Sequence, residues 1–212
     1  VRGDCMIGIL PVEAIADVVE GQRRSAAAGL AQAREDLAST LDVLVAQDLQ
    51  YSAYGAAALA AAAEFGSPTA ALRAASLWMY SEDEDNAARA IALVRQQCES
   101  DANGSAHVLL GYMTYRGYGR DADKAESVRL HEAAAAMGSG DAMFELYVLY
   151  STGQGVATDV ARAHEWCRKA ADLGNARALF NLGTFYASGR GVPKDTTQAI
   201  SFYLRASERG HG

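Results

Sequence analysis

The sequence has few of the residues that break helices or cross-link small domains. Its 212 residues include three prolines and three cysteines, whereas alanine accounts for about a fifth of the chain. Three cysteines are too few to hold a disulfide-stapled miniprotein together. Scarce proline and abundant alanine both favour helix. We therefore expect a protein that is helical almost throughout.

Long apolar runs and excess positive charge are also missing. Hydrophobic residues make up 50% of the chain, which is too apolar for disorder. No apolar run approaches the roughly 18 residues of a membrane-spanning helix. The formal net charge is −7, with 19 basic and 26 acidic residues, which argues against a nucleic acid partner. We expect one or two globular domains without a membrane span.

Catalytic motifs are absent as well. His131-Glu132 and His164-Glu165 lack the second histidine of a zinc-binding helix, and the Gly-x-Gly elements lack the Gly-Lys-Ser/Thr of a phosphate-binding loop. Gly-x-Ser-x-Gly, Ser-x-x-Lys and Lys-Thr-Gly do not occur. We predict no catalytic residue, no metal and no cofactor, and we expect the four histidines to be solvated on the surface.

The chain does contain an internal repeat with a period of 36 residues. Its first clear copy is marked by Ala106, Leu110-Gly111, Gly117-x-Gly119 and Asp123. The pattern returns twice without insertion, at Ala142, Leu146, Gly153, Gly155 and Asp159, and at Ala178, Leu182, Gly183, Gly189, Gly191 and Asp195. A fixed period of this length is the signature of a solenoid.

Each repeat is predicted to fold as two helices. Residues 142–152 and 178–188 carry apolar letters at helical spacing, and the following glycines break the helix. Asp159 stands where the second helix needs an N-cap, and Gly174 stands where that helix ends. Neither helix can bury its apolar stripe alone, so neighbouring pairs must stack. The pattern predicts an all-α solenoid.

The register weakens towards the N-terminus. We expect three clear repeats over residues 105–212, degenerate helical repeats over 34–104 and an N-terminal helical cap over 1–33, in one continuous solenoid domain. Solenoids need atypical ends that cover exposed apolar faces. The alternative for residues 1–33 is a recognition segment.

The motif resembles the Sel-1-like repeat, a relative of the tetratricopeptide repeat. Residues 178–195 match every marked position, and 142–159 depart only at Tyr147, which replaces a glycine. Residues 106–123 carry Thr114 and Arg120 in place of the tyrosine and the valine. The resemblance implies antiparallel helix pairs in a right-handed superhelix. It also implies a bacterial scaffold or adaptor of envelope, signalling or host-contact systems.

The resemblance to tetratricopeptide proteins also implies a concave face lined by the first helix of each pair. Its exposed positions should lie two residues before, and two, five and six residues after, the leucine of the Leu-Gly pair. The predicted partner-binding residues are Tyr80, Val108, Tyr112, Tyr115, Arg116, Phe144, Val148, Phe180 and Thr184. Aromatic residues with arginine are typical of interface hot spots. The alternative for Phe144 and Phe180 is that they only complete the core.

The cysteines bear on the compartment. Some secreted Sel-1-like proteins carry one disulfide per repeat, but Cys98 and Cys167 are predicted on second helices two repeats apart. Helices pack about 8–10 Å apart and a disulfide needs Cα atoms within about 7 Å, so these two cysteines cannot pair. We expect Cys98 to be a buried free thiol, and leave Cys5 open.

The leading interpretation is a non-catalytic scaffold that binds a protein partner. It fits a bacterial envelope or periplasmic regulator, an assembly adaptor, or an immunity protein against a secreted toxin. The alternative is an enzyme acting on β-lactams or peptidoglycan, because some Sel-1-like proteins have been linked to β-lactams. A third possibility is self-association through an uncapped end, which fits the weak N-terminal repeats. The expected location is the periplasm or cell envelope, with the cytoplasm as the alternative.

Overall fold

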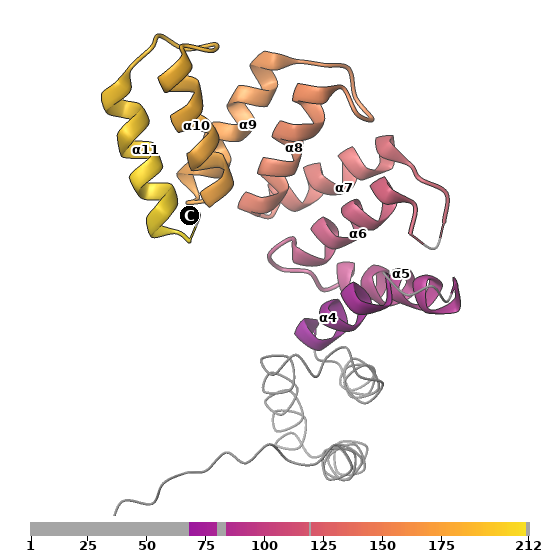
Figure 1. Ribbon diagram of the computed structural model, residues 1–212. Helices are drawn as coiled ribbons and strands as arrows, with labels where there is room; N and C mark the ends of the chain where they lie inside the picture. The colour runs from indigo at the N-terminus through magenta and orange to yellow at the C-terminus, as the bar shows by residue number, and fades with distance from the viewer. Residues whose placement is uncertain (1–67, 80–83, 119, 211–212) are drawn as a thin grey trace, which may run out of the picture. The chain divides into compact units, whose positions relative to one another are not determined.

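The computed structural model describes residues 68–79, 84–118 and 120–210 (Figure 1). Every regular element in these ranges is an α-helix, as the sequence predicts. The chain divides into two compact units, Val1–Glu82 and Asp83–Gly212. The described helix of the first unit is α4 (Pro68–Trp78). Those of the second unit are α5 (Glu84–Cys98), α6 (Ser105–Arg116), α7 (Lys124–Ala136), α8 (Gly140–Thr152), α9 (Val160–Asp172), α10 (Ala176–Ser188) and α11 (Thr196–Glu208).

Some of the sequence-based predictions fall outside the described residues. These are the helical cap over 1–33, the part of the degenerate repeats over 34–67, the side chain of Tyr80, and the expectations for Cys5 and His211. Helices α4 and α5 occupy part of the stretch 34–104 where degenerate helical repeats are predicted. The three-part division of the chain and its continuity as one domain stay predictions.

Three helix pairs follow one another through the second unit: α6–α7, α8–α9 and α10–α11 (Figure 1). Their second helices begin at Lys124, Val160 and Thr196, at intervals of 36 residues. The two helices of each pair pack together, and successive pairs meet through α7 with α8 and α9 with α10. The predicted all-α solenoid of stacked helix pairs is therefore confirmed for these residues.

The helices begin and end at residues that the sequence marks. Carboxylate oxygens cap all three second helices by accepting the backbone N–H three residues further on, at Asp123, Asp159 and Asp195. The first helices end at glycines whose φ angles, 72° to 75°, lie in the left-handed region that favours glycine: Gly117, Gly153 and Gly189. These fixed ends repeat the same helix–turn–helix geometry three times.

The core lies where successive pairs meet. Leu146 of α8 and Leu179 of α10 are fully buried, each in a cluster that also draws on the preceding helix pair. The second helices contribute small side chains that are buried at equivalent positions, Ala134, Ala170 and Ala206. Small residues allow close helix approach, so the apolar surface of each pair is buried against its neighbours.

Both described cysteines are free thiols, as expected from their separation. Cys167 of α9 is fully buried, and desolvation raises the pKa of its thiol to about 12. Cys98 was expected to be buried but is only half-buried, at the C-terminal end of α5. Burial is still the main cause that raises the pKa of Cys98, to about 11. Neither thiol is activated as a nucleophile.

Candidate functional site

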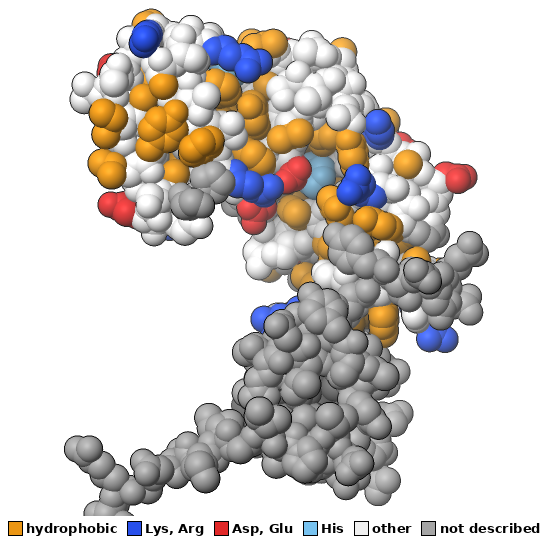
Figure 2. Space-filling view, viewed as in Figure 1, with side chains coloured by type: hydrophobic (Ala, Val, Ile, Leu, Met, Phe, Trp, Pro, Cys, Tyr) orange, Lys and Arg blue, Asp and Glu red, His pale blue; other side chains and the backbone are white. Residues whose placement is uncertain are grey.

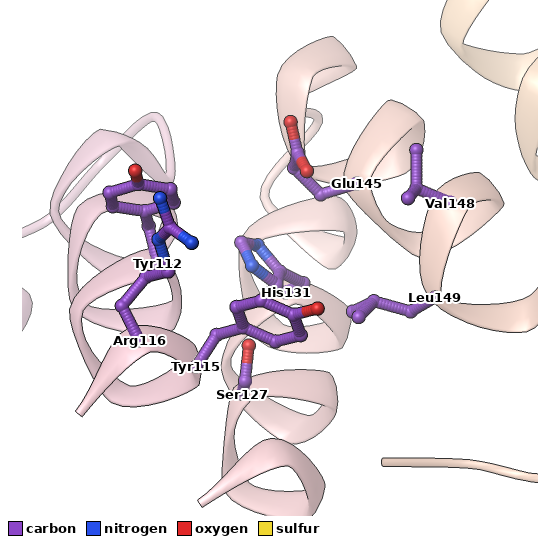
Figure 3. Close-up of a pocket in the computed structure, with 8 residues that line it drawn as sticks. All are labelled: Tyr112, Tyr115, Arg116, Ser127, His131, Glu145, Val148 and Leu149. Carbon is purple, nitrogen blue, oxygen red and sulfur yellow. The ribbon is translucent and has the colours of Figure 1, made fainter. Parts of the chain in front are cut away.

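Four of the predicted partner-binding residues line one cavity between α6, α7 and α8. The cavity has a volume of about 170 Å³, and the four residues are Tyr112, Tyr115, Arg116 and Val148. Figure 3 shows the α6 side chains on one side, those of α8 on the other, and two α7 side chains between them. The register of the repeat thus brings together residues from two successive repeats.

The α6 side of the cavity is aromatic and cationic. The Arg116 guanidinium lies 5.8 Å from the centre of the Tyr112 ring, and its hydrogen bond with Tyr112 is the main cause that raises its pKa. The Tyr115 hydroxyl donates a hydrogen bond to Gln154, and Lys124 Nζ lies 5.4 Å from the centre of the Tyr115 ring. Arg116 is exposed and both tyrosines are half-buried, so these groups form the rim.

The floor comes from α7 and was missed by the sequence reasoning. Ser127 and His131 line the cavity one helical turn apart, and both are buried. The expectation that the histidines are solvated is wrong for His131, which is 3% exposed. It is buried because its ring packs on the backbone of Gly111, where an added Cβ would lie 2.8 Å from Nε2. The glycine of the Leu-Gly pair was the available signal.

The floor is polar but uncharged. Desolvation lowers the pKa of His131 to about 4, so its imidazole is neutral at pH 7. Within the described parts of the chain, His131 Nδ1 and Ser127 Oγ have no hydrogen-bond partner. Buried polar atoms are nearly always paired, and an unpaired one costs about 1–3 kcal/mol. Both α7 residues therefore line the cavity, and these two buried atoms have unused hydrogen-bonding capacity.

The α8 side combines one carboxylate with apolar groups. Glu145, Val148 and Leu149 line it, and Glu145 Oε1 accepts a hydrogen bond of 3.0 Å from Arg177 Nη1 of α10. The same guanidinium lies 4.3 Å from the centre of the Phe144 ring. Arg177 thereby fixes the Glu145 carboxylate from the next repeat. The rim consequently carries charges of both signs around an uncharged floor.

The remaining described predicted residues do not join this cavity. Phe144 was expected to be exposed but is 8% exposed, because it packs into the cluster formed with α9, α10 and α11. This burial supports the core alternative for Phe144. Val108 is half-buried against the cluster around Leu146. Phe180 and Thr184 are exposed on α10, where both contact Tyr203.

A second cavity, of about 290 Å³, lies between α9, α10 and α11. It is lined by none of the predicted residues, and its cationic groups are Arg168 and Arg205. His164 also lines it, with its ring centre 4.5 Å from that of Phe185, and desolvation is the main cause that lowers the pKa of His164. Half-buried His164 also departs from the expected solvated surface histidine.

Within residues 68–79, 84–118 and 120–210, no cluster of three or more His, Cys, Asp or Glu side chains is placed to hold a metal ion. Nor does any helix in these ranges have the length and apolarity that crossing a membrane requires.

Comparison with known proteins points to one family. A family model for the Sel1 repeat matches residues 104–139, 140–175 and 176–211. A search of curated proteins finds no match. A crystal structure of a Sel1 repeat protein from Oxalobacter formigenes has 29% identity and a TM-score of 0.63, with 74% of this chain and 64% of that chain covered.

Two other solved structures share the fold. A protective antigen of uropathogenic Escherichia coli has 24% identity and a TM-score of 0.64, and the match covers 92% of this chain and 42% of the antigen. An immunity protein from Pseudomonas aeruginosa has 20% identity and a TM-score of 0.55, with 91% of this chain and 66% of that chain covered. This chain thus spans 64% and 42% of the length of the Oxalobacter and Escherichia proteins.

The matched stretches bear on the fold directly. Each of the three contains one complete helix pair of the described structure, and together they make up half of the chain. The chain belongs to the Sel1 repeat family.

Proposed function

We propose that the chain is a non-catalytic binding module that holds a protein partner against the face formed by its first helices. Sel1 repeat proteins are generally protein-interaction scaffolds. The observation that carries the proposal is the convergence of Tyr112, Tyr115, Arg116 and Val148 on one cavity. Aromatic residues and arginine around a pocket are the usual composition of an interface hot spot.

The proposed contact surface extends beyond the cavity. A stable protein–protein interface buries about 1,200–2,000 Å² in total, so a cavity of about 170 Å³ serves as an anchor within a larger surface. Exposed Phe180 and Thr184 and half-buried Val108 supply further area on the first helices. The partner is therefore expected to lie across successive repeats.

Selection of peptides from a random display library tests the proposal. The full chain is the bait, and enriched peptides are retested on Tyr112→Ala with Arg116→Ala. Tyr115 stays in place because it packs against the core cluster around Leu146. The matched control is Arg129→Ala, which removes an exposed arginine whose ion pair is with Glu126 of its own helix.

We expect enriched peptides to lose at least tenfold in affinity on the double variant and to bind the control as well as the wild type. Equal binding to all three proteins would contradict the proposed surface. Unfolding curves of the variants establish that the loss does not come from a damaged fold.

Three biological roles fit such a module: an envelope or periplasmic regulator, an assembly adaptor, and an immunity protein against a secreted toxin. The last is also the description of one of the proteins with this fold. The neighbouring genes discriminate between the three roles, since a sensor kinase, an export machine or a toxin would each favour one. We propose the periplasm or envelope as the location, and fractionation of the native cells tests it.

The competing class is an enzyme that acts on β-lactams or peptidoglycan. Binding and turnover separate cleanly in an assay of the purified chain with a chromogenic β-lactam. We expect no hydrolysis above the buffer rate. Sustained turnover, lost in a variant of a cavity residue, would replace the binding module with an enzyme.

A second mode of partner binding is self-association at the last helix pair. Figure 2 shows hydrophobic side chains gathered over α10 and α11, and Ile200 and Leu204 are 55% and 61% exposed. Val128, two repeats before Ile200, is buried against α8. The position of Ile200 is therefore one that the following helix covers in the first of the three repeats. Light scattering tests this mode, with a lower mass expected for Leu204→Glu if the face pairs.

A further inference from the structure

We propose that the cavity between α6, α7 and α8 accepts a carboxamide side chain, a glutamine or asparagine of the bound partner, through hydrogen bonds to His131 and Ser127. The inference rests on the proposed function and names the chemistry of the residue that anchors the partner. It is argued from the size, the unpaired groups, the charge and the walls of the cavity.

The size of the cavity fits one side chain. Its volume of about 170 Å³ is well below the roughly 300–1,000 Å³ of sites that hold drug-sized ligands. A nucleotide or a comparable cofactor is therefore too large. A single side chain inserted from a partner lying across the first helices is an occupant of the right scale.

The floor requires an occupant that both donates and accepts hydrogen bonds. A neutral imidazole has one N–H and one lone pair, and a serine hydroxyl donates one hydrogen bond and accepts others. His131 Nδ1 and Ser127 Oγ have no partner in the described structure. They lie four residues apart on α7, which places their Cβ atoms about 5–6 Å apart. A carboxamide presents a donor and an acceptor on separate atoms, so it can engage both groups at once.

The charge of the floor disfavours ionised side chains. His131 is neutral at pH 7, so a carboxylate that reached it would lose its hydration without gaining a cation beside it. Arg116 is exposed at the rim and remains in water. An ammonium or guanidinium group would enter past Arg116, and Glu145, the carboxylate among the lining residues, is already paired with Arg177. An uncharged polar group avoids both costs.

The walls suit the flat shape of an amide. The half-buried Tyr115 ring and the apolar side chains of Val148 and Leu149 surround the polar floor. Figure 3 shows the Tyr115 ring near the floor residues, with the Leu149 side chain extending towards it from α8. Apolar walls with a few placed polar groups are the usual composition of a specific small site.

The test uses three blocked amino acids as probes: N-acetylglutamine methylamide and its glutamate and leucine counterparts. Ring signals of His131 in the full chain are followed by NMR at pH 7 as each probe is added. The signals are assigned by their loss in His131→Gln. We expect the glutamine probe to shift the His131 signals and to bind at least tenfold more tightly than the other two probes.

Ser127→Ala provides a readout that a structural role would not give. It removes a buried hydroxyl that has no partner in the described structure, so we expect the unfolding midpoint to stay the same or to rise. Binding of the glutamine probe should nevertheless weaken at least tenfold. The matched control, Arg129→Ala, should bind the probe like the wild type, because its side chain is an exposed α7 arginine outside the cavity lining.

Equal or tighter binding of the glutamate or leucine probe would overturn the inference, as would unchanged probe binding by Ser127→Ala. The outcome is separate from that of the display selection. Selected peptides that need Tyr112 and Arg116 but contain no glutamine or asparagine would support the proposed function and contradict this inference. If the glutamine probe binds but the display selection enriches no peptide, this inference is supported and the proposed function is contradicted.

Discussion

The size of the side chain allowed at the glycine of the Leu-Gly pair depends on the residue that packs against it from the second helix. An added Cβ at Gly111 would lie 2.8 Å from the His131 ring, and one at Gly183 would lie 2.6 Å from the Tyr203 ring. In the middle repeat the equivalent of His131 and Tyr203 is Cys167, and the position carries Tyr147, packed against the cluster that contains this thiol. At these two facing positions, a small residue on one helix of the pair accompanies a large residue on the other. The reason is that the distance between the two helices stays similar from repeat to repeat.

The first prediction tests this size match at Gly111. Alanine normally stabilises a helix by about 1 kcal/mol relative to glycine. We expect Gly111→Ala to lower the free energy of unfolding instead, by about 1–3 kcal/mol, because the methyl group overpacks against the buried His131 ring. Urea unfolding of the full chain measures it.

The control for that prediction is the same substitution in the background of His131→Ala. There the methyl group of Gly111→Ala no longer meets a ring, so the substitution should raise the free energy of unfolding instead of lowering it. A Gly111→Ala substitution that destabilises both backgrounds equally would show that the ring contact is not the cause.

The second prediction concerns pH. His131 has a pKa of about 4 in the folded chain against 6.5 for its ordinary value, so the unfolded chain binds the proton more readily between these pH values. Stability due to neutral His131 is then full above pH 6.5 and is lost as the pH falls towards 4. At about 1.4 kcal/mol for each unit of pKa difference, the loss approaches about 3 kcal/mol.

Urea unfolding at several pH values between 4 and 7 measures this loss in the wild type and in His131→Gln. The variant should lack most of the decline. Contributions from Asp101 and His164, whose pKa values are also lowered, are common to both proteins. Parallel pH profiles for the two proteins would contradict the assignment to His131.

The site was predictable from the sequence only in part, and the reason is local. Register along the first helices was enough to nominate Tyr112, Tyr115, Arg116 and Val148, because equivalent positions of a repeat share a direction. The burial of Phe144 and His131 depends on which side chains the neighbouring helices place against them. The repeat pattern alone does not specify these contacts between helices. Gly111 is the exception, because a glycine there indicates a large side chain packed against it.

Helices as units were the most predictable feature of the chain. The three aspartates and the three terminal glycines marked the helix ends because the ends require specific chemistry, an acceptor for free N–H groups and a left-handed φ. Asp159 illustrates the first case: its Oδ1 accepts a 3.0 Å hydrogen bond from the Arg162 backbone N–H. Packing between helices, in contrast, depends on pairs of side chains that are distant in the sequence.

The third prediction tests this cap. Asp159→Ala should lower the free energy of unfolding by about 1 kcal/mol, because it leaves a backbone donor at the start of α9 without its acceptor. Asp159→Asn keeps a capping oxygen and should cost only a few tenths of that. The exposed ion pair with Arg162 adds little, so a large effect of the asparagine variant would shift the explanation from the cap to the charge.

Across the repeats, stability should follow the neighbours that each pair has. The pair α8–α9 has a described helix pair on each side, α6–α7 and α10–α11, whereas α10–α11 has only α8–α9 beside it among the described helices. The exposed apolar side chains of α11 mark the same asymmetry. In a solenoid, each repeat is stabilised by its own fold and by the interfaces with its neighbours.

The fourth prediction follows from this one-sided contact. Amide hydrogen exchange should be faster in α10 and α11 than in α8 and α9, because the last pair can open at the loss of one interface and the middle pair must lose two. Removing the cap of α11 with Asp195→Ala should speed exchange across residues 176–210 and leave 104–139 close to the wild type.

Asp159→Ala should speed exchange in the middle and last pairs together, since the last pair depends on α9. Uniform acceleration by both variants would mean that the three pairs unfold as one cooperative block and that nearest-neighbour coupling is not what limits their opening.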